Sequence, residues 1–145
     1  MAGPVNVRLY RPKQYYGMHS AAKAGFAPIV KAFEDFCRTL EQEILPDVML
    51  DALEPTLGLS LSYTPYATGE LYNSAFLDVS KRGRNPQVEI GYGKDGQAPY
   101  ALQVHEIPAY HEPPTRYKYL EAALMEDSGD ILQRIADGVK GGSGL

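Results

Sequence analysis

The sequence lacks several features that mark common classes of protein. Cys37 is the only cysteine of the 145 residues, so the chain has no internal disulfide and no thiolate cage for a metal ion. No apolar run approaches the roughly 20 residues that a membrane-spanning helix needs. No charged segment followed by an apolar one opens the chain as a signal peptide would. We therefore expect a protein made in the cytoplasm, with no membrane partner.

Motifs for catalysis and nucleotide binding are also missing. No glycine-rich phosphate loop follows a strand and no G-x-S-x-G elbow is present. Cys37 stands among apolar residues, where a lone cysteine acts as a small hydrophobic side chain. The net charge is −4, and the one basic cluster, Lys81, Arg82 and Arg84, is typical of a hairpin tip. These features predict a protein that is not an enzyme, binds no cofactor and has no general nucleic-acid surface.

Tyrosine, by contrast, is abundant. The chain has 11 tyrosines, four phenylalanines and no tryptophan. A tyrosine combines an apolar ring with a polar hydroxyl, which favours it at protein–protein interfaces. Its abundance therefore favours a protein that assembles, within a length that suits one domain.

The first long pattern of apolar residues predicts an amphipathic helix from about Phe26. Its stripe repeats every three or four residues and is expected to pack on a core; it comprises Ile29, Phe33, Phe36, Cys37, Leu40 and Ile44. Pro28 suits the first turn of such a helix. Pro46 predicts a kink or a stop, and a second helical piece is expected to end before Pro55. Residues 57–66 then read as a strand or an extended connection.

The second half of the chain predicts a hairpin followed by a helix. Residues 75–80 and 87–92 alternate as two strands around a turn rich in Gly, Asn and basic residues. Residues 100–107 fit either a strand or one or two helical turns, and Thr115 is a candidate cap for a closing helix. A glycine-rich flexible tail is expected at residues 141–145, and an arm at residues 1–25 that includes a short strand at Val5, Val7 and Leu9. The order of elements indicates one α+β domain over residues 26–140.

A cluster of histidines and acids in residues 98–124 leaves two readings open. In one reading, His105, Glu106, His111 and Glu112 form a metal or acid/base cluster, of which a small metal-dependent hydrolase would use His105, Glu106 and His111. A zinc-protease helix carries H-E-x-x-H so that both histidines share one face, whereas His105 and His111 are six residues apart with Pro108 between them. The other reading is a proline-stiffened structural segment that docks a neighbouring subunit.

Two sequence motifs resemble those of one viral family. The segment T-P-Y-A-T-G-E-L-Y-N-S at residues 64–74 is similar to the T-P-x-x-T-G-x-L-x-x-S signature of tail-completion, or neck, proteins of tailed bacteriophages. The later residues resemble that family's Y-A-x-x-V-H-E and K-Y-L-E patterns. The residues that carry this structural motif are Thr68, Gly69, Leu71, Ser74, His105, Glu106, Lys118, Tyr119 and Leu120. The resemblance covers roughly residues 26–139, and the order of the two motifs matches as well.

The resemblance implies helices packed on a small antiparallel sheet and a virion protein of the head–tail interface. It also implies a homo-oligomeric ring, sixfold or twelvefold, with connector or head-completion proteins on one side and tail-terminator or tail-tube proteins on the other. Genomic DNA would pass through the lumen without specific binding, as the net negative charge favours. An adaptor that remains a monomer and binds a host or assembly factor is a further alternative. Candidate subunit contacts are Tyr15, Tyr16, Tyr110, His111 and Tyr117.

Overall fold

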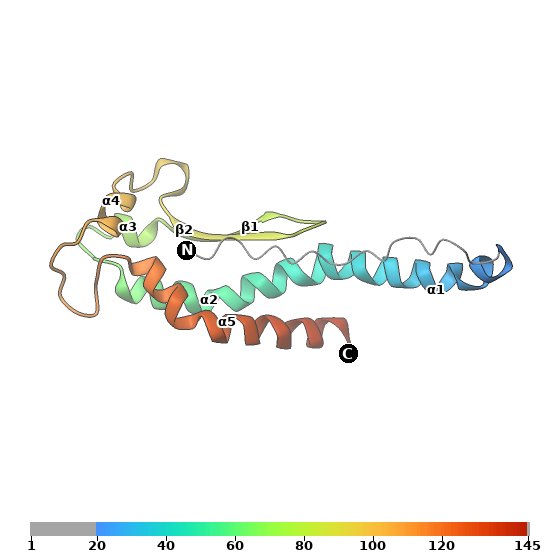
Figure 1. The fold of residues 1–145 in the computed structure, drawn as a ribbon. Helices are drawn as coiled ribbons and strands as arrows, with labels where there is room; N and C mark the ends of the chain where they lie inside the picture. Colours follow the sequence, from blue (N-terminus) through green and yellow to red (C-terminus); the bar gives the residue numbers. More distant parts are fainter. Residues whose placement is uncertain (1–19, 145) are drawn as a thin grey trace. The chain divides into compact units, whose positions relative to one another are not determined.

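The computed structural model describes residues 20–144, with side chains from Gly25 onward. The fold is α+β and rich in helix, with long helices toward both ends of the chain and a small antiparallel sheet, as predicted (Figure 1). The strand predicted at residues 5–9 and the candidate contacts Tyr15 and Tyr16 lie outside the described residues. Contacts divide the chain into two units, Met1–Asp35 and Phe36–Leu145.

The predicted first helix is longer than expected and runs directly into the next one. α1 covers Ser20–Thr39, so Pro28 lies inside it and not in its first turn. A π-helix, η1 (Leu40–Ile44), follows, and α2 covers Leu45–Tyr63. Across η1 the amide of Leu45 donates to the carbonyl of Leu40, five residues earlier. Pro46 then lies in the first turn of α2, where it needs no amide hydrogen. The predicted kink or stop is therefore a local change of helical pitch.

The predicted end at Pro55 and the extended segment at residues 57–66 are wrong. α2 contains Pro55 and continues to Tyr63, and the extended backbone begins only at Thr64. The buried face of this helix is small and polar, with Thr56 and Ser60 fully buried one turn apart. Leu57, Leu59 and Leu61 alternate as in a strand. This alternation conceals the four-residue, helical spacing of the buried Thr56 and Ser60.

Most of the apolar stripe of α1 is exposed among the described residues. Ile29 is 63% exposed and Phe33 is 60% exposed. Phe26, Val30 and Phe36 are exposed as well. The amphipathic helix was predicted correctly, but the expected burial of its stripe is met only in part within residues 25–144, because Cys37, Leu40 and Ile44 are half-buried and the earlier residues are exposed.

The predicted hairpin forms the sheet. β1 (Ala75–Lys81) pairs antiparallel with β2 (Gln87–Tyr92), with Leu77 opposite Ile90 and Asp78 opposite Glu89. One face of the hairpin packs on α2, and α2 also packs along α5 (Figure 1). The pairing shifts by one residue between Val79 and Lys81, which leaves Ser80 as a bulge.

Short elements connect this hairpin to the closing helix. They are α3 (Glu70–Asn73), the 3-10 helix η2 (Lys94–Gly96) and α4 (Ala101–Glu106). Of the two readings for residues 100–107, the helical one is confirmed. The closing helix α5 covers Tyr119–Ser143. Its N-cap position is Lys118, so the predicted cap Thr115 is wrong; the Thr115 hydroxyl donates instead to the carbonyl of Glu112.

α5 continues through the glycines that predicted a flexible tail. A Cβ built on Gly138 would lie 2.6 Å from Cγ1 of Val48, and one on Gly142 would lie 2.8 Å from Cγ2 of Ile44. The absence of side chains therefore lets α5 approach α2 and η1 closely, and packing keeps these glycines helical up to Ser143.

The core of the second unit is built around a tyrosine and small residues. Tyr119 is 1% exposed and packs with Leu71, Ala98 and Ala101. Ala122 and Ala123 of α5 and Ala52 of α2 are buried as well. Within residues 20–144, no helix is long and apolar enough to cross a membrane.

Candidate functional site

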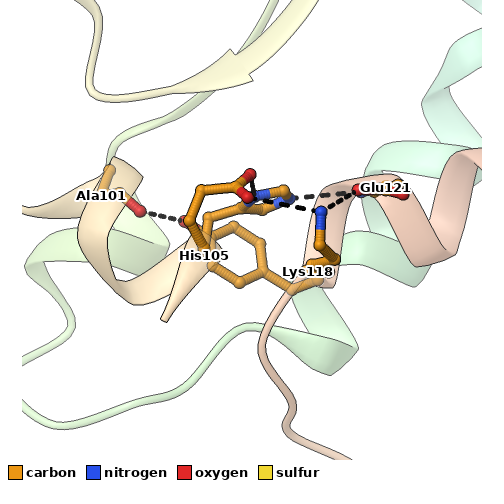
Figure 2. A network of polar contacts seen from close by, with 6 residues as sticks. Ala101, His105, Lys118 and Glu121 are labelled. Atoms are coloured by element: carbon orange, nitrogen blue, oxygen red, sulfur yellow. Dashed lines mark hydrogen bonds and ion pairs between the residues drawn. The ribbon is translucent and has the colours of Figure 1, made fainter. Parts of the chain in front are cut away.

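The V-H-E segment and the K-Y-L-E segment meet at the start of α5. Figure 2 shows His105 of α4 facing Lys118 and Glu121 at this end of the helix. The amide of Glu121 donates to Nε2 of His105 (3.4 Å), so Nε2 is an acceptor and the ring proton lies on Nδ1. Nδ1 then donates to Oε1 of Glu106 (2.7 Å). The imidazole thus accepts one of the amide hydrogens that the first turn of a helix leaves without a partner.

Lys118 also contacts this junction between the end of α4 and the start of α5, which we call the α4–α5 corner. Its backbone is left-handed, with φ 54°, and its amide donates to the carbonyl of His105 (2.7 Å). Its Nζ lies 2.6 Å from Glu121 and 3.4 Å from Glu106. The hydrogen bond from His105, and then that from Lys118, lowers the pKa of Glu106. The hydrogen bond to Glu121, followed by that to Glu106, raises the pKa of Lys118. The corner is therefore a closed network of charges.

Tyr119 joins this corner to the sheet. Its hydroxyl donates to the carbonyl of Ala101 (3.0 Å), and its ring makes edge-to-face contacts with His105 and Tyr92, each with a centroid distance of 4.9 Å. Burial, with a smaller effect from Tyr92, raises the pKa of Tyr119 to about 12. A buried, protonated phenol with a fixed acceptor is a structural group at neutral pH.

A chain of hydroxyl hydrogen bonds joins Tyr92 of β2 to Ser60 and Thr64 at the end of α2. Thr64 donates its hydroxyl hydrogen to the carbonyl of Ser60 (2.8 Å), so toward Tyr92 it acts as an acceptor. Tyr92 donates to Thr64 and accepts from Ser60, both at 2.9 Å. All three hydroxyl hydrogens are used, and burial raises the pKa of Tyr92. Sequence reasoning missed this group, although the four-residue spacing of Thr56, Ser60 and Thr64 was visible.

The residues of the T-G-x-L-x-x-S motif form a tight turn and a short helix. Gly69 has φ 83°, and a Cβ there would lie 2.8 Å from the Tyr66 hydroxyl. The amide of Glu70 donates to the hydroxyl of Thr68 (3.3 Å), which precedes the N-cap residue Gly69. Leu71 is buried in the core. Ser74 donates to the carbonyl of Leu71 (2.6 Å) and accepts from the amide of Gly93 (3.2 Å), which connects α3 to the turn after β2.

The remaining candidate contacts lie in the loop between α4 and α5. Tyr110 is 86% exposed, and Tyr117 is exposed as well. His111 is half-buried, and its Nε2 has no hydrogen-bond partner among the described residues. The loop contains a cis peptide between Pro113 and Pro114. The amide of Arg116 donates to the carbonyl of Tyr63 (2.9 Å), which fastens the end of the loop to α2.

The histidines and acids of this segment do not converge on one point. Both ring nitrogens of His105 are hydrogen-bonded, and within residues 20–144 no three His, Cys, Asp or Glu side chains form a group that could hold a metal ion. A pocket of about 90 Å³ lies nearby, lined by Pro65, Ala67, Thr68, Gly69, Leu71, Tyr100 and Val104. This volume is below the roughly 300–1,000 Å³ that is usual for small-molecule sites.

A second polar group, which sequence reasoning also missed, clamps α2 to α5. Arg134 donates to both carboxylate oxygens of Asp127, at 3.2 and 2.5 Å, and to the carbonyl of Ala52 (2.9 Å). The Thr56 hydroxyl donates to Asp127 (2.5 Å). The Asp127 and Arg134 spacing of two helical turns is the only signal for this clamp in the sequence, and it is too common to single out.

Comparisons with protein-family models, with curated proteins and with solved structures found no match for this chain.

Proposed function

We propose that this chain is a structural virion protein of a tailed bacteriophage that forms a ring in the neck and joins the head connector to the tail. The proposal starts from the resemblance of residues 64–74 and 100–121 to tail-completion proteins. The observation that supports it is that residues of both motifs make structural contacts within the fold. His105, Glu106 and Lys118 hold the start of α5, and Gly69 and Ser74 shape the turn around α3.

The exposed side chains support assembly. Tyr110 and Tyr117 present aromatic rings from the loop after α4, while Ile29 and Phe33 present apolar side chains from α1. Exposed apolar residues that gather on one element often mark protein–protein contacts. A ring subunit requires two different contact surfaces, one for each neighbour. Partners above and below, namely connector or head-completion proteins and tail-terminator or tail-tube proteins, require further surfaces.

The test is the mass of the purified protein in solution, measured by light scattering over a range of concentrations, alone and with connector protein added. We expect a species of six or twelve copies, formed either alone or on the connector. A protein that stays a monomer with the connector and with the tail proteins contradicts the proposal. Stoichiometric zinc in the purified protein would favour the metal-dependent hydrolase instead.

Tyr110 allows a sharper form of this test. Because its ring is exposed, Tyr110→Ser should leave the free energy of unfolding within about 0.5 kcal/mol of the wild type. If the ring anchors a neighbour as an interface hot spot, the same change should weaken assembly by about thirtyfold or more. Gln103→Ala, an exposed change on α4, is the matched control and should leave assembly unchanged. Equal assembly of both variants removes Tyr110 from the interface.

A further inference from the structure

The hairpin has two open edges. The sheet contains only β1 and β2, and among residues 20–144 no backbone hydrogen bond joins the outer edge of either strand to another element. A two-stranded hairpin is marginal by itself, and its free edge offers a row of amides and carbonyls to a further strand. Most soluble proteins protect such an edge, so an unprotected one suggests that another strand occupies it.

The two edges differ in charge and regularity. β1 has the bulge at Ser80 and ends with the basic Lys81, and its Asp78 already forms an ion pair with Lys94 (2.6 Å). β2 is regular and carries one charged residue, Glu89, which is exposed. Glu89 contributes, after Asp78, to the raised pKa of Lys94, but the ion pair of Lys94 is with Asp78. A bulge disfavours the addition of a strand, so the β2 edge is the better template, and it favours a basic strand.

The segment that matches this edge precedes α1. Residues 5–9, Val-Asn-Val-Arg-Leu, alternate apolar and polar side chains. Residues 1–19 contain Arg8, Arg11 and Lys13 and no acidic residue, so they carry +3 while the rest of the chain carries −7. The alternation suits a sheet with one apolar and one polar face, and the charge suits the acidic body of a second copy.

We propose that residues 5–9 of a neighbouring copy add a third strand to the free edge of β2. In this register Val5, Val7 and Leu9 extend the apolar face formed by Val88 and Ile90, which packs on α2. Asn6 and Arg8 then lie on the opposite face, and Arg8 lies beside Glu89. Backbone hydrogen bonds supply the binding and the Arg8–Glu89 pair fixes the register, as in other cases of strand addition. The inference rests on the proposed function, because a ring supplies the neighbouring copy.

Disulfide trapping tests the contact directly. Cys37→Ser removes the native thiol, and Arg8→Cys is combined with Glu89→Cys on β2 or, as the matched control, with Asp78→Cys on β1. We expect mild oxidation of the assembled protein to give a ladder of covalent oligomers for the Glu89 pair and none for the Asp78 pair. A further pair, Asn6→Cys with Glu89→Cys, tests whether the added strand is shifted by two residues, so that Asn6 and not Arg8 lies beside Glu89.

Each other outcome overturns the inference. A disulfide within one chain places the arm on its own subunit, a ladder for the Asp78 pair places it on the β1 edge, and no disulfide removes it from the sheet. Light scattering on the same samples keeps the two proposals apart. A ring without the disulfide contradicts only the strand addition, whereas a failure to form any ring contradicts the neck function.

Charge reversal supplies a second readout. Arg8→Glu and Glu89→Arg should each weaken assembly by about two- to fivefold, the range for a partly exposed ion pair. The double variant should restore it. Single variants that assemble like the wild type, or a double variant no better than either, exclude the Arg8–Glu89 pair.

Discussion

His105 illustrates how a residue with catalytic potential can be used for structure. Its Nε2 accepts from the amide of Glu121, its Nδ1 donates to Glu106, and its ring makes an edge-to-face contact with Tyr119. The same carboxylate, imidazole and lysine in an open cleft would suggest acid/base chemistry. Here each group has a partner from the corner itself, so the network holds α4 against the start of α5.

Removal of the imidazole should therefore destabilise the fold. For His105→Ala we expect a loss of about 1–3 kcal/mol in the free energy of unfolding, from the lost helix-end acceptor and the lost aromatic contact. Gln103→Ala, exposed on the same short helix, should change it by less than about 0.5 kcal/mol. Urea unfolding followed by circular dichroism measures both. A His105→Ala protein as stable as the wild type would exclude the capping role.

The ionisation of Asp127 makes the stability of the fold depend on pH. Its hydrogen bonds from Arg134, and more weakly from Thr56, lower its pKa below the ordinary value. A carboxyl whose pKa is lower in the folded state stabilises the fold above its unfolded pKa, about 3.9 for Asp. That contribution disappears as the pH falls through the lower folded pKa.

The corresponding prediction compares the wild type with Asp127→Asn. At pH 7 the variant should be less stable by about 1–3 kcal/mol, since Arg134 and Thr56 lose a charged acceptor. The difference should shrink steadily as the pH falls below about 4. Urea titrations at pH 7, 5, 4 and 3 measure it. Ser128→Ala, one residue away on α5 and exposed, is the control. A difference that stays constant down to pH 3 would show that the charge of Asp127 is not what matters.

At the scale of elements, the seam between α2 and α5 depends on glycine at particular positions. A Cβ on Gly138 would meet Val48 at 2.6 Å, whereas a Cβ on Gly129 would meet nothing within 4 Å. We expect Gly138→Ala to destabilise the protein by about 1–3 kcal/mol through overpacking. Gly129→Ala should stabilise it by about 0.5–1 kcal/mol, because alanine is the better helix former. Thermal unfolding compares the pair.

Val48→Ala tests the cause. It removes the methyl groups that a new Cβ at position 138 would meet, so Gly138→Ala should cost less in a Val48→Ala background than in the wild type. Additive effects of the two changes would mean that α5 does not lie against Val48 in solution.

The pattern of apolar residues predicted the hairpin and both long amphipathic helices, because apolar residues recur there at the spacing of a strand or a helix, even in α1, where the stripe is largely exposed. It failed in the second half of α2. There the buried positions are Thr56 and Ser60, and a polar stripe is invisible to hydrophobic periodicity. The prolines misled for a related reason. Pro46 follows a π-helix that accommodates it, and Pro55 is tolerated inside a helix that packing against α5 supports.

The candidate site was predictable only in its parts. The motif residues pointed to the corner between α4 and α5, but the role of His105 as an acceptor for α5 depends on a contact between separate elements. The sequence placed the start of that helix at Thr115, because threonine is a common cap. The left-handed backbone at Lys118 and the imidazole from α4 replace it, and neither has a signature that local reasoning detects.

At the scale of the whole molecule, the positive and negative charges are concentrated in different parts of the sequence. Residues 1–19 carry +3 and the remainder carries −7. In a closed ring, each basic arm would dock on the acidic body of a neighbour. This would neutralise the positive charge of the arm and part of the negative charge of the body. The charges that remain exposed on such a ring are then predominantly acidic, which suits a lumen that DNA must cross without adhering.

This division of charge leads to a prediction about DNA. The assembled protein should not bind duplex DNA measurably at about 0.15 M salt, with a Kd above the roughly 10⁻⁴ M that marks weak non-specific binding. In Glu89→Arg, which cannot pair with Arg8, a larger fraction of the basic arms should be undocked and give weak binding that declines as salt rises. Fluorescence anisotropy with a labelled duplex compares the two proteins. Tight binding by the wild type would mean that its basic residues face the DNA, and would exclude a lumen that DNA crosses freely.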